Sequence, residues 1–478
     1  MDIIIILISI IAGIMTGIIT GLIPGIHVNT IAAIMVSIAA VLYGYGIDST
    51  GIAVYIASVA VAHAFFDYIP SLFLGVPNDE VFALLPGHRM VKEGRGIEAL
   101  HLSIQGSWNG IKIGVSILLI VLLISSTGIE FFKILDTYIK PYLFWILSSI
   151  SIILIFSETK RLWALLIFLL SGFYGMVVFG SALVPSTTAA FNGLFPALAG
   201  IFGVSGLIFS LFEKIGDLPV QKEANKLPID DKEIQKSSIR GTGAGIAVGL
   251  LPGLGAANAA TLLLLVENWL DRKSEKNTSQ YRYIVTTSAI NTSDTLFGIA
   301  ALYFIEKTRS GASVAMSQLF EGDFSLTALI AVIFGTSMSA YVSMKIMKQY
   351  STFIARFVSK LHYKGLNLSV LVFLILFIYL TLGGWGIVIM IGGTLLGMLP
   401  QLVNVRRAQA MGFFLLPVIL FYSSYQSEIV SLIHLKARVT YHESIEINKI
   451  ALYLIISAGI SVLIYAMVSI FPKILPKK

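Results

Sequence analysis

The sequence predicts an all-α polytopic membrane protein with two inverted-topology repeats, broken Pro-Gly helices and about 12 to 15 membrane segments. Composition, recurring apolar runs and an internal repeat support this fold class. Of the 478 residues, 56% are hydrophobic and 12% are charged, whereas soluble domains are about 25% charged. Mean hydropathy is +0.87. Lipid is therefore expected to be the solvent for most of the chain, which argues against a soluble enzyme.

Apolar runs long enough to span a bilayer recur from residue 3 to residue 470. The first run starts at Ile3 without a basic segment or a cleavage site, so we expect it to be retained as a span. The net charge of +7 comes from Lys and Arg in short loops, where they set topology, so no nucleic-acid partner is expected. The chain has no Cys, which excludes disulfides and thiolate metal sites, and we expect no metal and no cofactor.

An internal repeat appears at an offset of 228 positions. Three glycines at four-residue spacing followed by Leu-x-Pro-Gly occur in both copies, which predicts a duplication. The matched residues are Gly13, Gly17, Gly21, Pro24 and Gly25 in the first copy, and Gly241, Gly245, Gly249, Pro252 and Gly253 in the second. Further along, His63–Asp67 aligns with Ile290–Asp294 at an offset of 227, which makes Asp67 and Asp294 counterparts.

Loop charge predicts that the two copies have opposite orientations. Basic loops of one copy correspond to non-basic loops of the other, as inverted repeats require. The stretch 345–364 is basic and its counterpart 117–136 is not. We therefore expect repeats at 1–212 and 241–478, a polar linker at 213–240, an outside N-terminus and a cytoplasmic C-terminus in the cell membrane.

The Pro-Gly segments are predicted helix breaks, because proline removes a helical hydrogen bond and glycine loosens the backbone. A helix that restarts after a break has free N–H groups and attracts anions. Paired breaks in inverted halves point to a transporter site, although two kinks that only aid packing are the alternative. The predicted substrate-binding residues near the breaks are Pro24, Gly25, His27, Asn29, Pro252, Gly253, Gly255 and Asn258.

Ionisable residues inside apolar stretches indicate ion coupling, because charge at membrane depth is costly. His63 lies one helical turn before Asp67, and the pair could hold a proton. The oxygen atoms of Ser293 and Asp294 could bind sodium, with Asn291 and Thr292 nearby in the substrate site. The alternative is that these residues only cap or bridge buried helices.

Pro77-Asn78-Asp79-Glu80 is typical of a helix start with an Asn N-cap and two acids in the first turn. Asn78 is also a candidate substrate ligand and Asp79 a candidate ion ligand, because this segment directly follows the Asp67 helix.

These motifs resemble the large permease subunit of tripartite tricarboxylate transporters. The resemblance rests on Gly21–Gly25, on 75–110 with its Leu-Pro-Gly-His-Arg stretch, on Gly249–Gly255 and on 289–316. It implies a secondary carrier of organic anions that works with a small membrane subunit and an extracytoplasmic binding protein.

The sequence departs from the family pattern at three places. Asn78-Asp79-Glu80 replaces a neutral Gly-Thr-Pro, Arg309-Ser310-Gly311 replaces Pro-Gly-Ser, and Asn291-Thr292 replaces an Asn-Asn pair. Because Ser310 and Gly311 occupy the place of the family's Pro-Gly-Ser motif, the resemblance adds them to the predicted substrate-binding residues.

We therefore expect a permease, not an enzyme, that carries a small carboxylate-type organic anion by symport with H⁺ or Na⁺. The alternatives are a flippase for a lipid or isoprenoid phosphate, a lipid-modifying intramembrane enzyme, and a scaffolding subunit without transport. No phosphate-binding loop for ATP occurs in the sequence.

Overall fold

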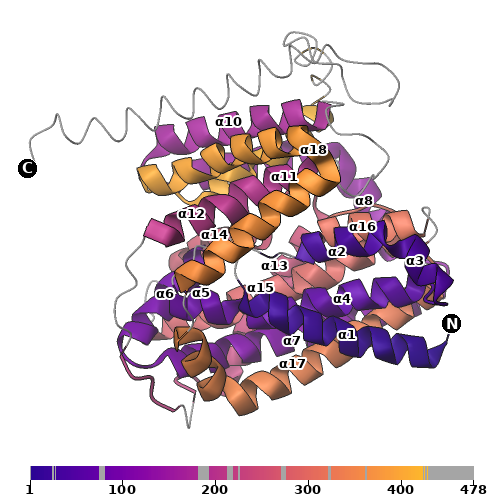
Figure 1. Ribbon diagram of the computed structural model, residues 1–478, viewed down its shortest axis with the longest axis horizontal. Coiled ribbons are helices and arrows are strands. Elements are labelled where there is room, and N and C mark those ends of the chain that lie inside the picture. Colours follow the sequence, from indigo (N-terminus) through magenta and orange to yellow (C-terminus); the bar gives the residue numbers. More distant parts are fainter. Residues whose placement is uncertain are drawn as a thin grey trace, which may run out of the picture. The chain divides into compact units, whose positions relative to one another are not determined.

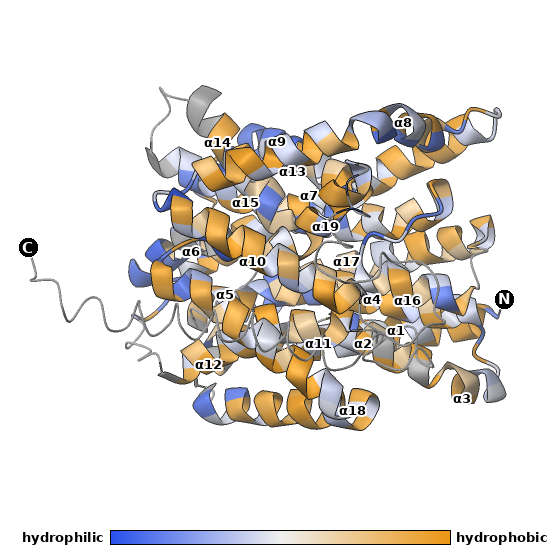
Figure 2. Cartoon of the chain, turned by 90° about the horizontal axis from the view of Figure 1, so that it is seen from above, coloured by the Kyte–Doolittle hydropathy of each residue, from blue (hydrophilic) through white to orange (hydrophobic). Residues whose placement is uncertain are grey.

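The computed structural model describes residues 2–23, 26, 28–74, 81–180, 193–212, 219–223, 227–270, 276–320, 324–360, 363–423, 425 and 428. Every regular element in these ranges is a helix (Figure 1). Among these described residues, eight helical segments are long and apolar enough to cross a membrane, and Figure 2 shows hydrophobic residues covering most of them. The protein is thus an all-α polytopic membrane protein, as predicted. The eight segments are Ile3–Leu22, Ser49–Phe73, Gly96–Ser125, Phe131–Phe156, Arg161–Phe179, Leu194–Leu211, Leu326–Phe357 and Lys364–Val403.

The chain divides into two compact units, and each unit takes residues from both halves of the sequence. Unit 1 comprises Met1–Thr137 and Lys214–Leu366, and unit 2 comprises Tyr138–Glu213 and Asn367–Lys478. The predicted boundaries around 213–240 concern repeats along the sequence, and they stay a prediction.

Unit 1 contains the helices on both sides of the two Pro-Gly segments. Those of the first half are α1 (Ile3–Leu22), α2 (Val28–Ser37), α3 (Ala39–Gly44), α4 (Ser49–Phe66), α5 (Tyr68–Leu74), α6 (Val81–Lys92), α7 (Gly96–Ser125) and α8 (Phe131–Ile139), which extends past the unit boundary. Those of the second half are α13 (Asp231–Leu250), α14 (Ala256–Leu270), α15 (Lys276–Phe304), α16 (Gly311–Leu319) and α17 (Leu326–Lys360). The bounds of α1 and α13 differ by the 228 positions of the repeat.

Glycines let α1 pack directly on the backbone of α4. A Cβ atom at Gly17 would lie 2.7 Å from the carbonyl oxygen of Val59, and one at Gly21 would lie 3.0 Å from that of His63. A Cβ atom at Gly21 would also lie 2.7 Å from Phe66 Cβ, and real Cβ contacts are almost never shorter than 3.0 Å, so glycine is the residue that fits at both positions. This small-residue stripe is the packing that membrane helices use in place of a hydrophobic driving force.

The second half repeats this contact, but the sequence offset of the contacted residues differs from that of the glycines. A Cβ atom at Gly245 would lie 2.7 Å from the carbonyl oxygen of Ile290, and one at Gly249 would lie 3.1 Å from that of Asp294. The contacted positions in α4 and α15 differ by 231, not by 227. The predicted pairing of Asp67 with Asp294 is therefore wrong: Asp294 is the counterpart of His63. The second half has three more residues between the glycine helix and its partner (231 against 228), a difference that sequence matching did not detect.

The contacts of α7 and α17 give the directions of the helices in unit 1. Gly106 and Gly110 of α7 meet Val285 and Ala289 of α15, so α7 and α15 run parallel. The same reasoning makes α1 parallel to α4 and α13 parallel to α15.

Helix α17 runs parallel to α4. Its Gly335 meets Val54 of α4, and its Ser339 hydroxyl donates to the carbonyl of Ser58 at 2.8 Å.

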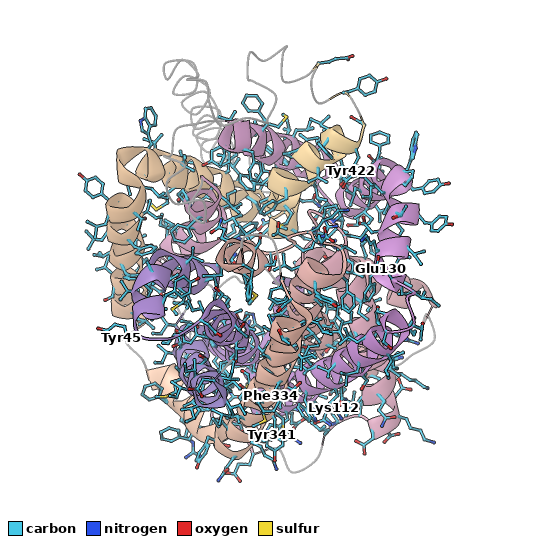
Figure 3. All side chains as sticks on the ribbon, turned by 90° about the vertical axis from the view of Figure 1, so that its right-hand side faces the viewer. Tyr45, Lys112, Glu130, Phe334, Tyr341 and Tyr422 are labelled. Carbon is cyan, nitrogen blue, oxygen red and sulfur yellow. The ribbon has the colours of Figure 1, made fainter. Side chains whose placement is uncertain are left out.

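The direct contacts between α7 and α17 show that they are antiparallel. His101 Nε2 lies 3.1 Å from Ser351 Oγ, while the rings of Trp108 and Tyr341 lie 6.0 Å apart. Tyr341 is exposed, and Figure 3 shows it on the same outer face of this unit as Lys112. Helices α1, α4 and α17 thus run in one direction, and α7, α13 and α15 run in the other.

Unit 2 is also held by backbone contacts at glycines. It contains α9 (Leu143–Phe156), α10 (Arg161–Gly180), α11 (Leu194–Leu198), α12 (Ser205–Phe212), α18 (Tyr363–Val403), which begins just before the unit boundary, and α19 (Gly412–Tyr422). Gly393 of α18 meets the carbonyl of Ala197, and Gly412 meets that of Phe168. The buried carboxylate of Glu158, in the loop after α9, lies 3.2 Å from Arg406, which follows α18 in the sequence. Burial raises the pKa of that carboxyl group despite the nearby guanidinium.

The described part of the linker binds the turn between α6 and α7. The side chain of Gln221 accepts a hydrogen bond from Gly96 N at 2.7 Å and donates to Val91 O at 3.1 Å. Lys222 N donates to Gly94 O at 2.8 Å. The connector therefore fixes the turn that carries part of the family-like 75–110 segment.

We predict that Gly245→Ala strongly destabilises the protein, because its Cβ atom would overlap the backbone of α15. The cost should be several kcal/mol, about that of overpacking a core (~1–3 kcal/mol) or more. The melting temperature of the purified protein in detergent measures it.

Gly243→Ala is the matched control on the same helix. A Cβ atom there meets nothing within 4 Å, so the change should be neutral or stabilising by up to about 1 kcal/mol. Equal melting temperatures for the two variants would contradict the helix register.

Candidate functional site

The second Pro-Gly segment separates helix α13 from helix α14. Helix α13 ends at Leu250, and α14 begins at Ala256. Between them the chain turns through Gly253, whose φ of 77° favours glycine. Pro252, Gly253 and Gly255, three of the predicted substrate residues, all lie in this half-buried turn.

The first turn of α14 has no side-chain cap. The carbonyl of Gly255 accepts from Asn258 N at 2.9 Å and from Ala259 N at 3.2 Å, so Gly255 is the N-cap and has no side chain to offer. Within the described part of the chain, the N–H groups of Ala256 and Ala257 have no acceptor.

Asn258 lies in this turn with an exposed fraction of 0%. Neither its amide nitrogen nor its amide oxygen has a hydrogen-bond partner among the described residues. Buried amides are normally paired, since an unmade hydrogen bond costs about 1–3 kcal/mol. Asn258 is thus a buried polar group at a helix N-terminus whose hydrogen-bonding atoms have no partner among the described residues.

Asp294 lies beside the end of α13, just before the break. Its backbone packs between Gly245 and Gly249 of α13, and the side chain is half-buried. The described residues provide it with no hydrogen bond and no ion pair. The last carbonyl groups of α13 lie on this side of the break and carry the negative end of the helix dipole.

His63 occupies the equivalent place beside the end of α1. Its Nδ1 atom lies 3.1 Å from the Thr20 hydroxyl, and its Nε2 atom lies 4.0 Å from Asp67 Oδ2. The residue is 9% exposed. The predicted His63–Asp67 pair is therefore present in the structure, with Thr20 as a third member.

Three further predicted residues meet at the start of α16. A Cβ atom at Gly311 would lie 2.5 Å from the side chain of Asn29, which belongs to α2. Ser310 is the N-cap of α16 and forms a reciprocal capping box with Ser313. Unlike α14, α16 thus has an N-terminus that is capped by its own side chains.

The polar residues around Asp294 take part in helix packing. The Thr292 hydroxyl donates to Ser107 O of α7 at 3.1 Å, and the Ser293 hydroxyl donates to Ala289 O at 2.5 Å. Both side chains are buried, whereas Asn291 is half-buried on the same helix. Their predicted roles as ligands stay predictions.

Five predicted site residues lie outside the described residues: Pro24, Gly25, His27, Asn78 and Asp79. Among the residues that the structure does describe, no group of three or more His, Asp or Glu side chains could hold a metal ion.

Sequence reasoning missed two features of the site. Thr20 is one: a hydroxyl residue one position before Gly21 in a glycine stripe was the available signal. The other is Arg309, whose side chain is 7% exposed and lies 3.8 Å from Asp136 Oδ1. No pattern in the sequence pairs α8 with the start of α16.

Comparison with known proteins gives a family for the chain. The family model described as "Tripartite tricarboxylate transporter TctA family" matches residues 7–412. An uncharacterized protein of Methanocaldococcus jannaschii, MJ1079, is 29% identical over 403 residues, which are 83% of this chain and 94% of that protein. No solved structure matches. Because the match spans both Pro-Gly segments and most of the chain, the protein belongs to the TctA family of tripartite tricarboxylate transporters.

Proposed function

We propose that this protein is a secondary carrier for a small carboxylate-type organic anion, coupled to H⁺ or Na⁺. One observation carries the proposal: a titratable residue lies at the same place beside the end of each glycine-striped helix, His63 beside α1 and Asp294 beside α13. Family membership supports transport of organic acids in general.

The helix directions support two inverted repeats. Helix α1 runs opposite to its counterpart α13, α4 runs opposite to α15, and α7 runs opposite to α17. Carriers built in this way place substrate and ions at the discontinuous helices near the membrane midplane, and they expose the site to each side in turn.

The second break suits a coupling cation on its α13 side. Asp294 is a carboxylate without a described partner, and it lies next to the negative end of a helix dipole. Carboxylate and backbone carbonyl oxygens are ligands for small hard cations. A proton on Asp294 would also remove the repulsion between its negative charge and the negative end of the α13 dipole.

The first break has a different chemistry. His63, whose imidazole can bind a proton, lies beside the end of α1, and its Nε2 atom is 4.0 Å from Asp67 Oδ2. This half therefore suits a proton, whereas the second half suits a proton or sodium.

The resemblance to tripartite systems extends the proposal to partners. We infer that the chain assembles with a small membrane subunit and an extracytoplasmic binding protein. We also infer that it resides in the cell membrane with its N-terminus outside and its C-terminus in the cytoplasm, as loop charge indicates.

Asp294→Asn should reduce cation-driven uptake of organic anions by about 10- to 100-fold, because a charged ligand contributes about 1.5–3 kcal/mol. Uptake of a panel of radiolabelled carboxylates into proteoliposomes, under a proton or a sodium gradient, measures this.

Glu130→Gln is the control for a general loss of negative charge. Glu130 forms an exposed ion pair with Lys133 at 3.3 Å, so uptake should be unchanged. Wild-type uptake rates for Asp294→Asn would remove Asp294 from the coupling mechanism.

The inverted arrangement predicts that the C-terminal ends of α7 and α17 lie on opposite sides of the membrane. Because the chain contains no Cys, single-cysteine variants can be placed at Thr127, which is exposed just after α7, and at Gln349, which is exposed near the end of α17. In intact cells, a membrane-impermeant maleimide should label Thr127→Cys only.

After the cells are opened, both variants should react. Labelling of both variants from the outside would show that α7 and α17 have the same orientation, and the inverted arrangement would be wrong.

A further inference from the structure

We propose that the first turn of α14 and the Asn258 amide bind one carboxylate group of the transported anion, and that this anion is a monocarboxylate with an apolar body. The inference rests on the proposed transport function and names the recognition element and the substrate class.

The anion-binding groups come from the backbone. With Gly255 as N-cap, the N–H groups of Ala256 and Ala257 have no side-chain acceptor, and they lie at the positive end of a 15-residue helix. Such a terminus is suited to a carboxylate.

The Asn258 amide is an independent indication of a ligand. Side chains on a helix lean toward its N-terminus, so Asn258 at the third position leans toward the free N–H groups. Its amide is fully buried and has no described partner. A bound carboxylate would accept from the amide nitrogen together with the backbone N–H groups.

The start of α16 does not offer the same site. Its N-cap Ser310 accepts from Ser313 N at 3.1 Å, and the Ser313 hydroxyl accepts from Ser310 N at 2.8 Å. Because these contacts satisfy the orphan donors internally, a carboxylate gains less there than at α14.

The apolar residues packed around the α14 turn bear on the class of substrate. They form a cluster from α13, α14, α15 and the Pro-Gly turn: Val248, Leu254, Ala259, Ala260, Leu263 and Ile290. Apolar surroundings disfavour a second or third charged group, because an unpaired buried charge is costly. The chemistry therefore fits one carboxylate on a short hydrocarbon chain.

The half-exposed break and the buried amide indicate how the site is reached. Residues 251–256 are all half-buried, whereas Ala257 and Asn258 are buried. A ligand that reaches the amide would therefore approach along the Pro-Gly turn and would have to displace it.

Ligand-induced thermal stabilisation of the purified full-length protein tests the inference separately from transport. Butyrate is the probe, citrate tests for a tricarboxylate, and butyramide has the same shape as butyrate without the charge. We expect butyrate to raise the melting temperature of the wild type and butyramide to have no effect. We expect the half-saturating concentration of citrate to be higher than that of butyrate by roughly tenfold or more.

Asn258→Leu should weaken the response to butyrate by roughly tenfold or more. Without ligand it should be as stable as the wild type or more stable, since it replaces a buried amide that has no partner among the described residues with an apolar group. Asn109→Leu is the matched control: Asn109 is buried in α7, and its amide donates to Ser238 Oγ at 3.2 Å. It should lose stability but keep the wild-type half-saturating concentration.

Gly255→Ser is a second variant that leaves Asn258 intact. A serine N-cap would occupy the free N–H groups, so it should also weaken butyrate binding.

Four results would overturn the inference. They are no stabilisation of the wild type by butyrate, tighter binding of citrate than of butyrate, an equal response to butyramide, and unchanged butyrate affinity in either Asn258→Leu or Gly255→Ser. Proteoliposome uptake of another anion alongside any of these results would leave the proposed carrier function standing and refute only this site.

Discussion

The contact of helix backbone on helix backbone at the glycine stripes is the constraint on which unit 1 depends. At Gly17 and Gly21 of α1, and at Gly245 and Gly249 of α13, the partner helix is so close that a Cβ atom has no room. Neither helix of such a pair can slide or rotate by a residue without a clash. The contact therefore fixes the axial position of α4 relative to α1 and of α15 relative to α13. His63 and Asp294 are thereby held beside the last turn before each break.

This fixed geometry gives the two halves the same shape but different electrostatics. Both side chains lie near helix C-termini, where the dipole favours cations. An imidazole that can become positive, with Thr20 and Asp67 as neighbours, satisfies that preference by itself. A carboxylate does not, and Asp294 has no described partner that would compensate. The two halves thus share a backbone geometry but differ in the chemistry of the side chain that it positions.

The sequence was sufficient for the features that depend on residue type at fixed spacing. The glycine stripes, the second Pro-Gly break and the equivalent bounds of α1 and α13 follow from the 228-residue repeat, because glycine and proline act locally on the backbone. The pairing of Asp67 with Asp294 failed because it depends on loop length between helices, and three extra residues shift the register without changing either pattern.

Other features of the site depend on contacts between distant segments. That the buried amide of Asn258 has no partner among the described residues is recognisable only once its surroundings are known. The Arg309–Asp136 ion pair joins residues far apart in the sequence. Neither could be read from spacing, since each arises from how α8, α14 and α16 pack in three dimensions.

The charges inside unit 1 bear on which anion the second break can hold. Two basic side chains of unit 1 already have acidic neighbours: Arg309 lies 3.8 Å from Asp136, and His63 lies 4.0 Å from Asp67. The α14 terminus contributes only about half an elementary charge. A trianion placed there would bring about three negative charges against that partial charge, and Asp294 would add its own repulsion unless it carried a proton or a cation. A single carboxylate needs far less compensation, and a cation at Asp294 would then attract the anion across the break, so that each ligand favours the binding of the other. Coupling between the two would follow from Coulomb attraction across the five residues that separate the end of α13 from the start of α14.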